Sequence, residues 1–164
     1  MKMLNETVRI NADPRATEYL ERNIIFSGDI HIPVLTLHTT GDGLVVVENE
    51  SAYSQVVREE GNGQFLRRTF VSRAGHCTFT PAETIAAVQT LLARLETGKW
   101  PDVDASNMNT TATTLGPAFN VFPSPQGKLV PVSPGFVDFK PARYLRPFDG
   151  EAEECEFGSR CRDR

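Results

Sequence analysis

Two residues of this chain, Asp42 and His76, have the types and settings that acid–base chemistry needs. Asp42 closes a turn at 39–42, directly after the apolar run 33–37. His76 lies in a loop at 74–77 that follows a second candidate strand. A carboxylate that accepts a hydrogen bond from one histidine nitrogen fixes the tautomer and stabilises the imidazolium formed when the other nitrogen takes a proton. The pair therefore predicts two members of a Ser-His-Asp triad, with Asp42 orienting the ring of His76.

Each of these residues also has a structural interpretation. Gly-Asp-Gly around Asp42 is common turn chemistry, and His76 lies close enough to the helix start at Thr80 to be a capping or core histidine. His31 and His38 are weaker candidates, because His38 closes an apolar strand and such a histidine is more often buried and satisfied. No short-range spacing joins these side chains into a metal site. We therefore expect no metal and no cofactor.

The nucleophile is the missing member. A serine nucleophile of this chemistry sits on a sharp Gly-x-Ser-x-Gly turn, and no such pattern occurs in the 164 residues. Cys77 is a poor substitute, because the turn needs a small residue where Phe79 stands and a helix directly after it. Ser72 shares one short segment with His76 and could hardly face its ring. We expect the nucleophile to lie upstream of Met1, which would make this the rear part of a catalytic domain.

The elements that must position the pair alternate between strands and helices. Asp13 and Pro14 predict a capped helix over 13–23. The Val/Leu-rich run 33–37 predicts a strand covered on both faces and central in a parallel sheet. Asn49 or Ser51 is expected to cap a helix that continues through Val57 and stops at the glycines of 61–63.

A second strand and a second helix follow. Residues 65–72 predict the strand. Thr80 and Glu83 predict a capping box at the start of a helix over 80–97, which Gly98 ends. One apolar face is expected on this helix: Ile85, Val88, Leu91, Leu92 and Leu95. The order strand, helix, strand, helix predicts an α/β fold with parallel strands and right-handed crossovers.

The composition changes after Gly98. Residues 99–150 carry most of the prolines and predict an irregular extension that wraps the main body, with short β pieces at 118–122, 128–132 and 136–139 confined to edges. Residues 151–164 are polar and unpatterned and predict a disordered tail. Part of this tail, 156–159, also looks like the product of two adjacent cloning sites. We therefore divide the chain into 1–98, 99–150 and 151–164.

Two motifs resemble the C-terminal part of the α/β-hydrolase family of esterases, lipases and peptidases. They are the acid segment 37–45, with Thr39 where the family usually has a small glycine, and the Gly-His loop 74–79, and the resemblance covers about 14–97. It implies a partial parallel sheet flanked by helices, with the order nucleophile, acid, base along the chain. It also implies a fragment of a serine hydrolase of small ester or amide substrates, inactive alone because the nucleophile and oxyanion hole are missing.

Bulk properties exclude several other classes. A formal net charge of −4 gives no electrostatic reason to bind nucleic acid or an anionic membrane. No apolar run is long enough to span a membrane, and no targeting signal is evident, so the cytoplasm is the default location. Cys77, Cys155 and Cys161 lack zinc-site spacing and are expected to be free thiols. A disulfide between Cys155 and Cys161 is the alternative.

An interaction module is the competing interpretation. A sheet that lacks its front strands would have an open edge and uncovered apolar faces. Such an edge predicts self-association or a partly molten chain, and it also predicts pairing with a partner polypeptide. The residues give no indication of the substrate.

Overall fold

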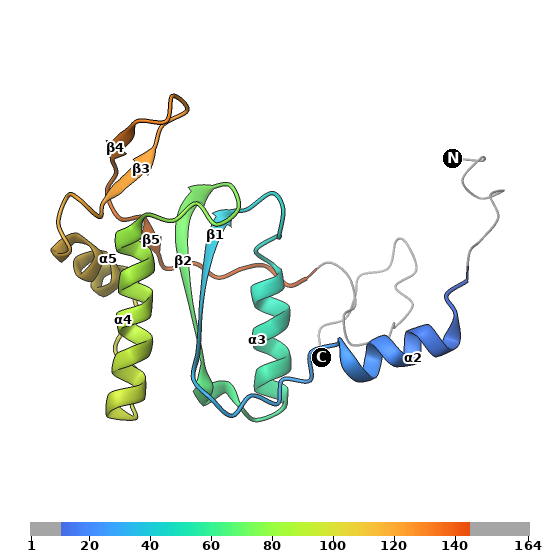
Figure 1. Cartoon of the computed structure of the whole chain (residues 1–164). Coiled ribbons are helices and arrows are strands. Elements are labelled where there is room, and N and C mark those ends of the chain that lie inside the picture. The colour runs from blue at the N-terminus through green and yellow to red at the C-terminus, as the bar shows by residue number, and fades with distance from the viewer. Residues whose placement is uncertain (1–10, 145–164) are drawn as a thin grey trace.

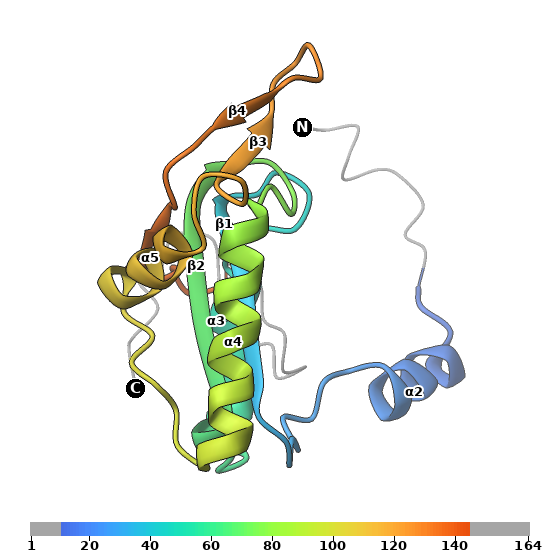
Figure 2. The same ribbon diagram turned by 60° about the vertical axis from the view of Figure 1, so that its left-hand side comes forward.

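The computed structural model describes residues 11–144, and its centre is a pair of long parallel strands, β1 (Val34–Gly41) and β2 (Leu66–Ala74). Helices α4 (Pro81–Thr97) and α5 (Ala105–Thr114) lie on one face of this pair, and α3 (Asn49–Glu59) lies on the other (Figures 1 and 2). The predicted α/β fold with parallel strands between helices is confirmed.

The register of β1 and β2 positions the predicted site. Their pairing runs from Val34 opposite Leu66 to Gly41 opposite Ala74, with one irregularity between Thr39 and Gly41. Because the strands are parallel, their carboxyl ends lie at one edge of the sheet. The loops that carry Asp42 and His76 therefore leave the sheet side by side.

The strand predicted at 33–37 lies at an edge of the described sheet and not at its centre. The strand order is β1-β2-β5, so β2 is the middle strand, and among the described residues β1 is paired on one side only. The third strand, β5 (Phe136–Val137), is antiparallel to β2. An apolar run reports that the faces of a strand are covered, and it carries no information about which neighbours hydrogen-bond to its edges. Leu35 and Leu37 do pack against the core.

Helix α4 begins and ends as predicted. Thr80 Oγ1 accepts from the Glu83 N–H at 3.2 Å, and Glu83 Oε2 accepts from the Thr80 N–H at 2.7 Å, which completes the capping box. Pro81 occupies the first turn, and Gly98 ends the helix with a φ of 71°. The left-handed conformation at this position favours glycine.

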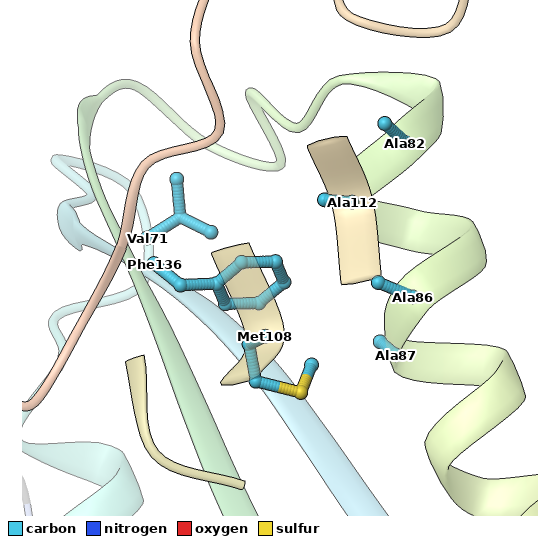
Figure 3. Packing of buried hydrophobic residues seen from close by; sticks show 7 residues of the cluster. All are labelled: Val71, Ala82, Ala86, Ala87, Met108, Ala112 and Phe136. Atoms are coloured by element: carbon cyan, nitrogen blue, oxygen red, sulfur yellow. The ribbon is translucent and has the colours of Figure 1, made fainter. Parts of the chain in front are cut away.

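The apolar face expected on α4 is not the one that the core uses. Val88, Leu92 and Leu95 are 51%, 48% and 59% exposed. The buried face is instead built from small side chains, which let α4 approach the sheet and α5 closely. These pack with residues of β2, α5 and β5 (Figure 3): Ala82, Ala86 and Ala87 with Val71, Met108, Ala112 and Phe136. The sequence thus gives α4 two apolar stripes, and its pattern alone did not say which one faces inward.

Helix α5 is an element that the sequence analysis missed, because 99–150 was expected to be irregular. Asp104 caps it by accepting from the Asn107 N–H at 2.9 Å. Threonine is a weak helix former, yet the hydroxyls of Thr110, Thr111 and Thr113 all donate to carbonyls one turn earlier. The expected β pieces are present as the hairpin β3 (Val121–Pro123) and β4 (Leu129–Pro131) and as the edge strand β5.

The remaining elements lie near the start of the described chain and around α3. Asp13 caps α2 (Pro14–Asn23) as predicted, but α2 buries none of its residues and lies apart from the sheet in both views (Figures 1 and 2). Helix α3 is followed by the short 3₁₀ turn η1 (Gly63–Phe65). Neither Asn49 nor Ser51 caps α3, because Glu48 occupies the N-cap without a side-chain bond. Asn49 instead donates to the Val46 carbonyl at 2.9 Å.

Two results concern the limits of the described chain. The tail predicted at 151–164, with Cys155 and Cys161, lies outside residues 11–144. Within 11–144, none of the helices has the length and apolar character needed to cross a membrane.

Candidate functional site

Asp42 and His76 meet across two neighbouring loops. The Nδ1 atom of His76 lies 2.7 Å from Asp42 Oδ2, within the range of a charge-assisted hydrogen bond. The Asp42 side chain is 3% exposed, whereas that of His76 is 44% exposed. The carboxylate is therefore fixed inside the fold while the imidazole stands at the surface.

The turn after β1 holds Asp42 by its other oxygen. Oδ1 accepts from the Leu44 N–H at 2.8 Å and from the Val45 N–H at 2.9 Å. The bond from Val45 is the largest cause that lowers the pKa of Asp42 from 3.8 to about 2; burial opposes it, and bonds from His76 and Leu44 add to it. Asp42 is thus ionised at neutral pH with one oxygen left for His76.

The loop after β2 is tied to the end of β1. The Gly75 N–H donates to the Gly41 carbonyl at 3.0 Å, and Thr39 Oγ1 donates to the Gly75 carbonyl at 2.6 Å. Gly75 has a φ of 99°, and a Cβ there would lie 2.8 Å from Thr78 Cγ2. A residue with a side chain would strain this loop, so the glycine of the Gly-His motif has a steric reason.

A buried ion pair closes the far side of the same loop. Both Glu83 oxygens bind Arg73, at 2.7 and 3.0 Å, and Arg73 also donates to the Thr78 carbonyl at 2.7 Å. Burial acts to raise the pKa of Glu83, but bonds from Arg73, Thr80 and Gly135, with the charge of Arg73, leave it below its ordinary value. This carboxylate, 0% exposed, joins the end of β2 to the start of α4 and so fixes both ends of the His76 loop.

The other nitrogen of His76 lies next to Cys77. Its Nε2 atom lies 3.5 Å from Cys77 Sγ, and no second hydrogen-bonding partner of Nε2 occurs within 11–144. Cys77 is exposed and has a φ of 54°. The next helix begins only at Pro81, so Cys77 lacks the tight strand-to-helix turn of a nucleophile elbow. Ser72 is exposed, and its N–H pairs with the Gly135 carbonyl.

The other histidines lie in different surroundings. His31 is exposed and lies 3.0 Å from Asp29. His38 is largely buried, as the sequence predicted, between Glu50 and the Val45 carbonyl. Its Nε2 atom lies 3.8 Å from Asp42 Oδ2. Sequence reasoning missed Glu50, for which an acidic residue on the buried side of a short helix is the only signal.

The arrangement is suited to acid–base chemistry. An ionised carboxylate orients a partly exposed imidazole, as the acid–base half of a nucleophilic triad requires. Within the described residues, no group of three His, Cys, Asp or Glu side chains could hold a metal ion.

Comparison with known proteins gives one partial relationship. The chain is 36% identical over 115 residues to an o-phthalyl amidase of Xanthobacter agilis, and the match covers 68% of this chain and 25% of that protein. The chain therefore spans about a quarter of the length of the relative. No protein-family profile and no solved structure matches it. Part of this chain is thus related to an amide hydrolase.

Proposed function

We propose that Asp42 and His76 are the acid and the base of a serine hydrolase of the α/β-hydrolase type, which cleaves an amide or ester by acyl transfer. The observation that carries this proposal is the 2.7 Å contact between His76 Nδ1 and an Asp42 carboxylate whose other oxygen is held by two N–H groups. The partial relationship to an amidase supports amide hydrolysis as the reaction.

In this mechanism His76 moves protons at Nε2. It takes the proton of the serine hydroxyl as the oxygen attacks the carbonyl carbon, and it gives that proton to the leaving amine or alcohol. Water then repeats the cycle on the acyl-enzyme. Asp42 keeps its charge throughout, since its pKa is about 2, and it stabilises the imidazolium. A polypeptide segment outside these 164 residues supplies the serine and the oxyanion donors, so the chain alone is inactive.

A chimera tests the proposal. The related part of the o-phthalyl amidase is replaced by residues 11–144 of this chain, which supply Asp42 and His76, and amide hydrolysis is measured. We expect the chimera to be active and Asp42→Asn to lower kcat by about 10⁴-fold. His76→Gln should lower it at least as much.

His31→Gln is the matched control, because that exposed histidine lies outside the pair and should leave kcat unchanged. A folded, active chimera that keeps its rate with His76→Gln would refute the proposal.

Inactivity of the chain alone has its own test. The purified chain should not hydrolyse a p-nitrophenyl ester above background, because catalysis that survives loss of a triad member comes from the oxyanion hole and substrate binding. Turnover that His76→Ala abolishes would contradict this part of the proposal and would direct attention to Cys77.

A second candidate function is an interaction module, and a specific surface favours it. On the described chain β1 is paired on one side only, and Val88, Leu92 and Leu95 of α4 are exposed. An open strand edge and uncovered apolar side chains both bind other polypeptides. Self-association that Leu92→Lys weakens in sedimentation would support it, and a monomer at all concentrations would count against it.

A further inference from the structure

A second histidine and carboxylate lie directly beneath the Asp42 turn. Both ring nitrogens of His38 face oxygen atoms: Nδ1 lies 3.3 Å from Glu50 Oε1, and Nε2 donates to the Val45 carbonyl at 3.0 Å. The two side chains are 12% and 11% exposed. Both partners are acceptors, so the ring bonds to both only when each nitrogen donates a proton. Such a pair of bonds fixes the imidazole at both ends.

Glu50 is itself hydrogen-bonded to both long strands of the sheet. Its Oε2 atom accepts from Thr36 Oγ1 at 2.8 Å, and its backbone carbonyl accepts from Arg68 at 2.9 Å. The first of these bonds joins α3 to β1, and the second joins α3 to β2. The position of Glu50 is therefore fixed by both long strands. His38 connects Glu50 to the turn, because its ring lies between Glu50 and the Val45 carbonyl.

The contact with the turn reaches Asp42 through one residue. His38 binds the carbonyl of Val45, and the N–H of Val45 donates to Asp42 Oδ1. This N–H is also the largest cause of the low pKa of Asp42. In addition, His38 Nε2 lies 3.8 Å from Oδ2, the oxygen that holds His76. His38 is thus linked to one carboxylate oxygen through Val45 and lies near the other.

We propose that His38, supported by Glu50, is a positioning residue for Asp42: it fixes the turn at 42–45 so that the free carboxylate oxygen faces His76. The contacts described above support the effect of His38 on the turn. The effect of His38 on catalysis rests on the proposed function.

Two near-isosteric substitutions of His38 test this on the full chain. The amide nitrogen of glutamine can replace Nε2, and that of asparagine can replace Nδ1. His38→Gln therefore keeps a donor for the Val45 carbonyl, whereas His38→Asn loses it. Hydrogen exchange of the Leu44 and Val45 amides is followed by NMR, together with the His76 Nδ1 proton signal.

We expect exchange at Leu44 and Val45 to be about five times faster in His38→Asn, as the loss of a hydrogen bond worth about 1 kcal/mol implies, and the His76 Nδ1 signal to broaden. His38→Gln should restore most of the protection. Amides of the core helix α4, such as Ala86, should exchange at the parent rate in both variants. Glu50→Gln, which weakens the support of His38 while keeping a side-chain oxygen, should give an intermediate effect at the turn.

Two results would overturn the proposal. One is parent-like protection at Leu44 and Val45 in His38→Asn. The other is equal loss at the turn and at Ala86, which would mean that His38 only stabilises the whole fold.

The catalytic consequence is measured separately in the chimera. There His38→Asn should lower kcat severalfold with KM unchanged, and His38→Gln should recover it. If the turn responds as expected but amide hydrolysis does not depend on Asp42, the proposed function fails and the positioning role stands. If hydrolysis depends on Asp42 but amide exchange in the turn does not change in His38→Asn, only the positioning role fails.

Discussion

The two loops of the candidate site are held in different ways. The acid turn at 42–45 is closed mainly by its own carboxylate, because Asp42 accepts from N–H groups two and three residues ahead, and His38 adds a contact to the Val45 carbonyl. The base loop at 75–80 is closed from outside, by the buried pair of Arg73 and Glu83. A carboxylate can thus close its own turn, whereas the loop of a surface imidazole depends on the elements before and after it.

Exposure differs in the same direction. Asp42 is almost fully enclosed and His76 is nearly half exposed, which suits the proposed roles of Asp42 as a fixed charge and of His76 as a base that reaches a partner. If this is correct, changes to the ion pair should damage the fold, and changes within the turn should mainly alter the response to pH.

The largest expected effect is at the ion pair. Glu83→Ala leaves the Arg73 guanidinium largely buried without its carboxylate, which should lower the free energy of unfolding by about 3–5 kcal/mol. Urea unfolding followed by circular dichroism measures this. The double variant Arg73→Met with Glu83→Met is the control and should lose clearly less, since no unpaired charge remains. Equal losses in the two variants would show that the bonds from the Thr80 and Gly135 N–H groups to Glu83, and not its pairing with Arg73, hold the loop.

The next prediction separates two costs of a side chain at Gly75: the strain of the left-handed backbone and the steric clash with Thr78. Gly75→Ala should lower the free energy of unfolding by about 2–3 kcal/mol, because the new Cβ meets Thr78 Cγ2 at a left-handed position. Gly61→Ala is the matched control, with a φ of 80° but open space around the Cβ, and should cost about 1 kcal/mol. Chemical denaturation compares them, and equal costs would remove the role of Thr78.

Asp42 should contribute to the pH dependence of the free energy of unfolding. Its pKa is lower in the folded protein than the ordinary 3.8, so the ionised group stabilises the fold above about pH 4. That stabilisation is lost as the pH falls through 3.8 toward 2. The difference in unfolding free energy between the parent and Asp42→Asn should be constant above pH 5 and shrink below it. A difference unchanged at pH 2.5 would mean that Asp42 acts through shape alone.

Sequence reasoning found the pair because its signal is topological. Residues that follow neighbouring parallel strands must meet at one sheet edge, so the contact of Asp42 with His76 was predictable, while their catalytic roles stay a prediction. The Thr80 capping box was predictable for another reason, because its residues lie within one turn of the chain. What failed needed tertiary information: α4 buries alanines instead of Val88 and Leu92.

The supporting contacts were hidden for a related reason. Arg73 and Glu83 belong to different elements, as do His38 and Glu50, and no spacing pattern marks side chains that meet only after α3 and α4 pack on the strands. Helix α5 was missed because threonines disfavour a helix in isolation, whereas here its buried Met108 and Ala112 pack in the core. Packing decided these features, and a single sequence does not encode packing as a local pattern.

The smallest expected effect concerns Cys77, the one non-glycine residue with positive φ in the described chain. Cys77→Gly should relieve this left-handed conformation and raise the free energy of unfolding by up to about 1 kcal/mol, offset in part by the greater freedom of glycine in the unfolded chain. Cys77→Ala keeps the Cβ and removes only the sulfur near His76 Nε2, so it should not gain. Urea unfolding of both variants separates the two causes: a gain in Cys77→Ala alone would mean that the thiol contact, and not the backbone, is the unfavourable feature of the base loop.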